Sequence, residues 1–233
     1  MERLDKRLAN TGTWSRKEAR ELIRAGRVAA DGTVCRAPEQ KVPETAAVTV
    51  DGAPIGGGGP VYLMLNKPAG VVSSTDEPGE RTVMDLLGPE WRNRGLFPAG
   101  RLDKDTEGLL LITDDGPLAH RLLAPKRHVD KVYYVEVDGV LDQRDAEAVG
   151  TGIVLGDGTA CRPGELELLS GSAARITIHE GKYHQVKRML ASRGKPVRCL
   201  RRERFGPLIL DPDLPKGGWR ALTEEEIQAL FRQ

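Results

Sequence analysis

A run of four glycines and a proline at residues 56–60 is the strongest constraint on how this chain can fold. Glycine loses more backbone freedom on ordering than any other residue, and proline fixes its own backbone in an extended or turn conformation, so neither a helix nor a strand is expected to continue through this run. We therefore expect two domains, at residues 1–55 and 61–233, joined by a glycine-rich linker at residues 56–60.

The first segment carries the signals of helices followed by short strands. Ser15 and Glu18 form a capping box at a helix start, and Gly26 stands where a glycine commonly follows a helix end. Short strands are expected in residues 28–34 and 42–50. A core this small suits an accessory binding domain. The apolar residues of the capped helix share one face, and its other face is basic, with Arg16, Lys17, Arg20 and Arg24.

The second segment mixes strand and helix patterns. Continuous apolar runs predict buried strands at residues 61–65 and 109–113, and alternating patterns predict half-buried strands at residues 131–137 and 174–178. A capped helix is expected to close the chain after Thr223. Strands and helices mixed in this way predict an α+β fold.

Charge is balanced over the whole chain but not along it. Lys and Arg number 35 against 34 Asp and Glu, a formal net charge of +1, yet residues 181–204 hold nine basic residues and one acid. A second basic cluster comprises Arg121, Lys126, Arg127 and Lys131. A solvated surface explains most charge runs, but such surfaces usually mix their signs. A single-sign surface favours a polyanionic partner bound through its phosphates.

Other features exclude a membrane or secreted protein. No apolar run approaches the roughly 20 residues of a membrane helix, and the amino terminus lacks the apolar stretch of a signal peptide. Cys35, Cys161 and Cys199 are isolated and match neither a disulfide framework nor a metal-binding spacing, which fits the reducing cytoplasm.

Residues 100–109, GRLDKDTEGL, are the densest cluster of chemically useful groups. The acidic spacing is similar to the first half of a calcium-binding loop, but an apolar strand follows where that loop supplies its next oxygen, so calcium is disfavoured. Asp103 and Asp105 also resemble the carboxylate pair of a glycoside hydrolase. For Asp105 and Thr106, tying down a turn is the simpler interpretation. Asp103 follows Arg101, and a nearby cation favours an ionised carboxylate, suited to act as a nucleophile or base.

These residues resemble the signature of the RsuA family of pseudouridine synthases, which modify bacterial ribosomal RNA. The same family's motifs are matched by residues 65–70, 131–135 and 180–189, while residues 3–28 resemble an S4 RNA-binding domain. Because the matches occur in order along nearly the whole chain, chance agreement is negligible. The resemblance implies an S4 domain followed by a catalytic domain with a long, mainly antiparallel sheet and a central cleft.

The resemblance also implies roles for individual residues. Asp103 would be the catalytic aspartate, Lys187 its basic partner and Tyr133 the ring that stacks against the target uracil. Arg101 would fill the gap left by the flipped base, and Leu190 would help to line the uracil pocket. His184 is expected to be a structural histidine. The expected RNA-binding residues are Arg16, Lys17, Arg20, Arg24, Lys182, Tyr183, Arg188, Arg201 and Arg202.

The implied reaction needs no metal and no organic cofactor, because the conversion of uridine to pseudouridine involves neither a redox change nor net hydrolysis. The base must first leave the stack. Asp103 would then attack the sugar or remove its C2′ proton, and the residues alone do not distinguish these routes. A later base must take the C5 proton, and Tyr133 lies in the expected pocket.

The expected substrate is 16S rRNA, in a small-subunit assembly intermediate, acted on by a monomeric cytoplasmic enzyme. Residues 73–78, 183–189 and 202–204 resemble the small-subunit enzyme more than its large-subunit relatives, which often carry Asn-Arg in place of Tyr183 and His184. Two alternatives remain: a synthase acting on 23S rRNA, and an assembly factor that binds rRNA without chemistry. A pure binder has no need of Asp103, a carboxylate that repels phosphate.

Overall fold

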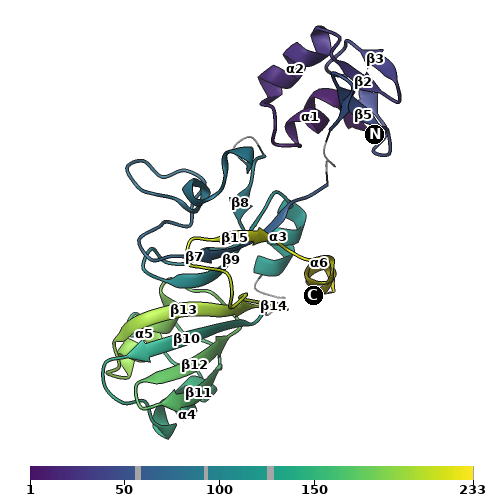
Figure 1. The fold of residues 1–233 in the computed structure, drawn as a ribbon. Coiled ribbons are helices and arrows are strands. Elements are labelled where there is room, and N and C mark those ends of the chain that lie inside the picture. Colours follow the sequence, from purple (N-terminus) through teal and green to yellow (C-terminus); the bar gives the residue numbers. More distant parts are fainter. Residues whose placement is uncertain (56–58, 92–93, 125–128, 233) are drawn as a thin grey trace. The chain divides into compact units, whose positions relative to one another are not determined.

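A computed structural model describes residues 1–55, 59–91, 94–124 and 129–232. Residues 56–58 of the expected linker, and Lys126 and Arg127 of the second basic cluster, lie outside the described residues. The chain divides into two compact units, Met1–Val61 with Leu87–Leu96, and Tyr62–Leu86 with Phe97–Gln233 (Figure 1). The domain boundaries expected from the sequence stay a prediction.

The first unit packs two helices against a small sheet. The capping box of Ser15 and Glu18 is present, and Gly26 has a positive φ of 74° just after the helix, where a Cβ would be strained. Apolar side chains from both helices and the sheet form one core, which includes Leu4, Leu8 and Ile23. The elements are β1 (Glu2–Arg3), α1 (Leu4–Ala9), α2 (Arg16–Arg24), β2 (Val28–Ala30), β3 (Thr33–Cys35), β4 (Lys41–Val42), β5 (Val48–Val50), β6 (Ala53–Pro54) and η2 (Pro89–Trp91).

A buried carboxylate orders the basic face of this unit. The side chain of Asp5 is fully buried and accepts hydrogen bonds from Arg3, at 2.9 and 3.0 Å, and from Arg20 Nε at 3.0 Å. Arg16 Nε lies 3.8 Å from the same carboxylate. Burial alone would raise the pKa of Asp5, but the bonds from Arg3 and Arg20 outweigh it and hold that pKa below its usual value.

The second unit is built on one mixed sheet. Among the described residues its strand order is β11-β12-β10-β13-β9-β7-β15, with β14 beside β13 and β8 beside β9. All neighbours are antiparallel except β13 and β9. The strands are β7 (Tyr62–Lys67), β8 (Phe97–Pro98), β9 (Glu107–Thr113), β10 (Lys131–Val137), β11 (Glu165–Ser170), β12 (Ala173–Ile178), β13 (Val197–Phe205), β14 (Leu208–Ile209) and β15 (Trp219–Ala221).

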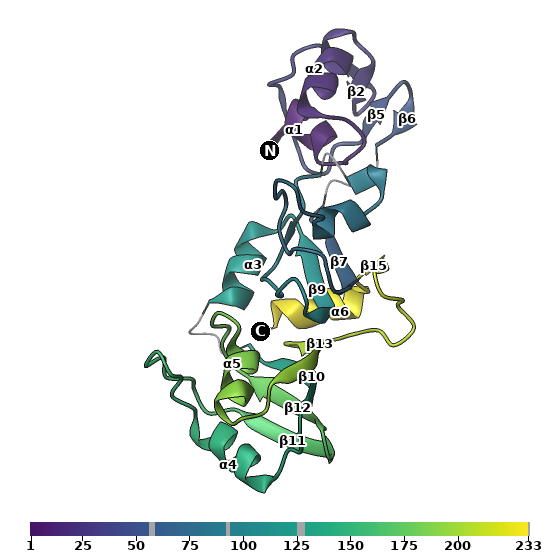
Figure 2. The same ribbon diagram turned by 90° about the vertical axis from the view of Figure 1, so that its left-hand side faces the viewer.

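Helices cover parts of this sheet. Figure 2 shows α4 beside β11 and α5 beside β13. Leu109 and Leu111 of β9 pack in one core with Leu122 of α3 and Leu230 of α6. Within the described ranges, none of the helices combines the length and apolar character that a membrane span requires. The helices are η1 (Val83–Leu86), α3 (Gly116–Leu123), α4 (Gln143–Thr151), α5 (Gln185–Ser192) and α6 (Glu224–Phe231).

The α+β fold and its mainly antiparallel sheet confirm the sequence-based expectation, and all four strands predicted for this unit are present. Strand β13 was not predicted, although it lies at the centre of the sheet, because its basic residues hide the usual apolar pattern. Its neighbours are β10 and β9.

The contact between β13 and β9 is short. These strands pair in parallel at only two positions, Arg201 with Glu107 and Arg202 with Gly108. Gly108 has a φ of 99°, and a Cβ there would stand 2.3 Å from the carbonyl oxygen of Arg202. Only glycine therefore permits this approach. The loop that precedes β9, with Asp103, is fixed beside this junction.

We expect the Asp5→Asn substitution to lower the free energy of unfolding of the first unit by about 2 kcal/mol near neutral pH, because charge-assisted hydrogen bonds to a buried group are lost. Asp5 has a depressed pKa in the folded state, so its contribution is present above the unfolded value of about 3.9 and is lost as the pH falls through the folded pKa. Urea denaturation over a pH series, followed by hydrogen exchange, measures both effects.

Asp51→Asn is the matched control, because Asp51 pairs with Arg27 on the surface, where both side chains are about half exposed. Its effect should stay within about 0.5 kcal/mol. The prediction would be contradicted if the two substitutions lowered the free energy of unfolding equally. It would also be contradicted if the difference in that free energy between wild type and Asp5→Asn persisted in acid.

Candidate active site

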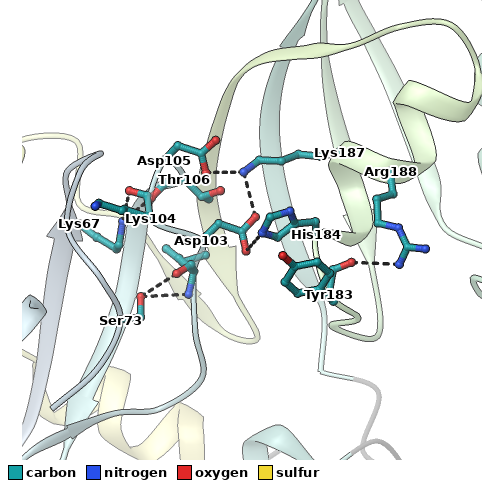
Figure 3. Close-up of polar contacts among 11 residues, drawn as sticks. Lys67, Ser73, Asp103, Lys104, Asp105, Thr106, Tyr183, His184, Lys187 and Arg188 are labelled. Atoms are coloured by element: carbon teal, nitrogen blue, oxygen red, sulfur yellow. Dashed lines mark hydrogen bonds and ion pairs between the residues drawn. The ribbon is translucent and has the colours of Figure 1, made fainter. Parts of the chain in front are cut away.

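An ion pair links the loop before β9 to helix α5. Lys187 Nζ lies 2.9 Å from Asp103 Oδ2 and 2.5 Å from Asp105 Oδ1 (Figure 3). The pair joins positions more than 80 residues apart in the sequence, and it is the contact that the resemblance implied for Asp103 and Lys187. The catalytic roles of the two residues stay predictions.

The two carboxylates that bind Lys187 differ in their exposure to solvent. Asp103 is about one-quarter exposed, whereas the Asp105 side chain is 73% exposed. Burial alone would lower the pKa of Lys187, but hydrogen bonds to Asp105 and Asp103 raise it above its usual value. Lys187 in turn lowers the pKa of Asp105, against the opposing effect of burial. The arrangement keeps an ammonium group beside Asp103 at neutral pH.

A second lysine holds the loop from beneath. Lys67, at the end of β7, is fully buried, and its Nζ donates to the carbonyl oxygens of Pro68 at 3.0 Å, Lys104 at 3.2 Å and Thr106 at 2.8 Å. Burial lowers the pKa of Lys67 to about 8, although nearby carboxylates oppose the shift. Asp103 thus lies in a loop whose backbone is tied to one ammonium group.

Ser73 ties the other side of the same loop. Its Oγ donates to Leu102 O at 2.9 Å and accepts from Leu102 N at 3.1 Å, one residue before Asp103. Lys67 and Ser73 lie in segments that carry the family resemblance, but their contacts to the loop could not be inferred from spacing alone.

His184, the residue directly before helix α5, lies beside the carboxylate. His184 has a left-handed φ of 47°, and its Nε2 lies 3.6 Å from Asp103 Oδ1. The ring is thus at the site and partly exposed, and the expectation that His184 is structural and not catalytic stays a prediction. The ring of Tyr183 stacks on that of His184, with centroids 4.0 Å apart and planes 14° from parallel.

A cleft opens between the Asp103 loop, β10, β13 and α5. A cavity of about 70 Å³ is lined by Asp103, Arg101 and Tyr133, and it adjoins a larger hollow of about 480 Å³ that also contains Arg101 and Tyr133 in its wall. Tyr133 lines both hollows although it is only 7% exposed, so most of its side chain is packed. The cleft thus unites three of the residues that the resemblance implied.

Leu190 lies elsewhere. It is fully buried on the face of α5 that packs into the core and is not among the residues that line the cleft. Val186, one helical turn earlier, lines the cleft in its place. The side chain of Thr106 lines the same cavity, and its buried hydroxyl has no hydrogen-bond partner among the described residues.

The single-sign surface expected over residues 181–204 is not present. Ion pairs join six of its nine cations to acids, and four of these acids come from distant parts of the chain, so a charge count along the sequence overstates the basic surface. Surface ion pairs of this kind are worth little, however, and phosphate can replace the carboxylate. The pairs are Lys182–Glu180, Lys187–Asp103, Arg188–Asp157, Arg193–Asp145, Arg198–Asp138 and Arg201–Glu203.

The expected RNA-binding residues separate into exposed and buried ones. Lys182, Tyr183, Arg188 and Arg201 all present part of their side chains to solvent. Arg202 is 2% exposed, and its Nε donates to Leu109 O at 2.8 Å, so it supports the sheet and is not part of an RNA-facing surface. In the first unit, Arg16, Lys17, Arg20 and Arg24 all lie on the exposed or half-exposed face of α2.

No cluster of three or more His, Cys, Asp or Glu suited to a metal ion occurs in the part of the chain that the structure describes. The acidic loop considered for calcium runs directly into β9, and its Asp105 binds Lys187.

Comparisons with known proteins agree with this architecture. Residues 61–192 match the RNA pseudouridylate synthase family, and residues 2–48 match the S4 domain. An uncharacterized RNA pseudouridine synthase of Bacillus subtilis, YtzG, is 46% identical, with 98% of each chain covered. Ribosomal small subunit pseudouridine synthase A of Pseudomonas aeruginosa is 43% identical, covering 97% of this chain and 98% of that one. A crystal structure of a pseudouridylate synthase superposes with a TM-score of 0.70, at 35% identity, covering 99% of this chain and all of that chain.

Fold and site thus define an RNA-modifying isomerase with an N-terminal RNA-binding domain. The chain belongs to the RNA pseudouridine synthase family, in the RsuA-type branch whose members carry an S4 domain before the catalytic domain.

We expect Lys67→Met to destabilise the second unit by about 3 kcal/mol, because three carbonyl oxygens lose a fully buried donor. The loop should also exchange its amide hydrogens faster and turnover should fall. Lys104→Met is the control, since Lys104 pairs with Glu80 on the surface and its loss should cost less than about 0.5 kcal/mol. Urea denaturation and hydrogen exchange at residues 103–106 test this; unchanged loop exchange in Lys67→Met would refute the anchoring role.

Proposed function

We propose that this protein isomerises a specific uridine of 16S ribosomal RNA to pseudouridine, with Asp103 as the catalytic residue. The observation that carries the proposal is the Asp103–Lys187 pair, which lies in a cleft walled by Tyr133. A carboxylate in an RNA-binding cleft repels phosphate, and a neighbouring ammonium group offsets that cost where chemistry requires an ionised acid.

The reaction breaks the N1–C1′ bond of uridine, turns the uracil and joins C5 to C1′. Asp103 begins it at the sugar, by attack on C1′ or by removal of the C2′ proton, and the proton later lost from C5 balances the bond that forms there. Lys187 holds Asp103 in position, because the ammonium group bridges Asp103 and Asp105.

The target base must leave the helix stack before the reaction. This step costs a few kcal/mol and is least costly in unpaired RNA. Tyr133 offers the everted uracil a ring face in the cleft, and Arg101, which is exposed at the cleft, is placed to occupy the gap left in the RNA.

Two sets of observations support 16S over 23S rRNA. Relatives that cover nearly the whole chain at 43% identity, from Pseudomonas aeruginosa and Escherichia coli, are named for the small subunit. Tyr183 and His184 also stand where large-subunit enzymes often carry Asn-Arg. The partner in this proposal is a small-subunit assembly intermediate, met by a monomeric enzyme in the cytoplasm, which fits the bacterial sources of these relatives.

Mapping pseudouridine in rRNA tests the function directly. We expect carbodiimide-dependent reverse-transcription stops to disappear at one 16S position in cells that lack the gene, and to return when the wild-type gene is restored. A change in 23S rRNA would transfer the proposal to the large subunit. An unchanged pattern in both RNAs would favour the non-catalytic assembly factor.

Asp103→Asn should lower turnover by about 10³-fold or more while RNA affinity changes little, because the substitution removes the reacting group and retains its size. Tritium release from C5-labelled uridine in the RNA measures turnover, and filter binding measures affinity. Asp105→Asn is the matched control, with a loss of about tenfold or less, since Lys187 keeps Asp103 as a partner. Turnover that persists in Asp103→Asn would remove Asp103 from the mechanism.

A further inference from the structure

Tyr183 is an aromatic side chain in an unusual position for this protein. Aromatic residues make up 4% of the chain, yet the Tyr183 side chain is 76% exposed. Large apolar rings gain free energy by burial, so an exposed ring beside a reaction site indicates a surface that a ligand covers.

The ring is held in a defined orientation. One face of Tyr183 is stacked on His184, and its carbonyl oxygen accepts a hydrogen bond of 3.4 Å from Arg188 Nη1. Arg188 is itself fixed by Asp157, at 2.6 Å. The support comes from the backbone and from the neighbouring ring, so the second face of Tyr183 stays open.

The stacked rings lead to the catalytic carboxylate. His184 Nε2 lies 3.6 Å from Asp103 Oδ1, and Figure 3 shows the Tyr183 and His184 side chains next to each other at this carboxylate. A base on the open face of Tyr183 would therefore be stacked in series with Tyr183 and His184, and the His184 ring contacts Asp103.

We propose that Tyr183, stacked on His184, is a platform for the base that flanks the everted uridine. The proposal rests on the function proposed above and adds a specific contact to it. When the uridine leaves the stack, its neighbour loses a stacking partner, and the Tyr183 ring replaces that partner. Aromatic stacking accepts any base, so the platform holds the strand without reading its sequence.

The contact is made once the base has everted and persists through the reaction, so it contributes equally to substrate and transition-state binding. Loss of the ring should therefore raise KM and leave kcat nearly unchanged. A structural role of Tyr183, in which it only positions His184 and Asp103, would lower kcat instead.

The experiment compares wild type with Tyr183→Ala, Tyr183→Phe and Ile209→Ala. Ile209 is a matched control, because it is also a large exposed apolar residue, on β14. With an rRNA fragment that contains the mapped uridine, Tyr183→Ala should raise KM about tenfold, the equivalent of about 1.4 kcal/mol, with kcat within about twofold. Tyr183→Phe retains the ring and should restore the wild-type KM.

A binding measurement separates this inference from the proposed function. A short single-stranded RNA with 2-aminopurine next to a uridine should lose fluorescence on binding to wild type and to Tyr183→Phe, and much less on binding to Tyr183→Ala. Absence of quenching with wild type, equal quenching by all variants, or a fall in kcat with constant KM would overturn the platform. If wild type quenches but modifies no rRNA, the proposed function fails and the platform stands.

Discussion

The close approach of β13 to β9 at Gly108 is the constraint on which the site depends. Because a side chain at this position would collide with the backbone of Arg202, the two parts of the sheet can join only at glycine. The join spans two residue pairs, after which the strands separate. Thr106 comes directly before this join on the β9 side and Leu200 directly before it on the β13 side, and both line the cleft, so the join fixes where the walls of the cleft meet.

The ammonium groups of the two lysines at the site have different roles. Lys67 binds backbone carbonyl oxygens from within and fixes the path of the loop, whereas Lys187 binds the carboxylates of Asp103 and Asp105 and fixes their positions at the cleft. A buried ammonium group without carboxylate partners is costly, and three well-placed carbonyl oxygens offset that cost. Order in the loop is therefore established before RNA arrives.

Sequence patterns predicted the elements that local residues determine, such as capped helices and apolar strands. They missed contacts between residues that are far apart in the sequence. The capping boxes at Ser15 and Thr223 and the apolar strands are local signals, and each was found. The motif resemblance placed Asp103 beside Lys187. Strand β13 was missed because its buried residues include Arg202. The contact of His184 with Asp103 was not foreseen, because it depends on the left-handed backbone of His184 and on the folded path of the Asp103 loop. The positive charge of the run at residues 181–204 was overestimated because four of its six counter-ions lie far away in the sequence.

The carboxylate of Asp5 at the centre of a basic face has a consequence for the thermodynamics of RNA recognition. Three arginines already share this one acceptor, so much of their rotational freedom is lost when the protein folds rather than when the polyanion docks. An acid that reduces the net positive charge of the surface can thereby strengthen association. A higher net positive charge on this face therefore does not by itself mean tighter binding of RNA. Removal of the Asp5 carboxylate would leave a surface that is more cationic but less ordered.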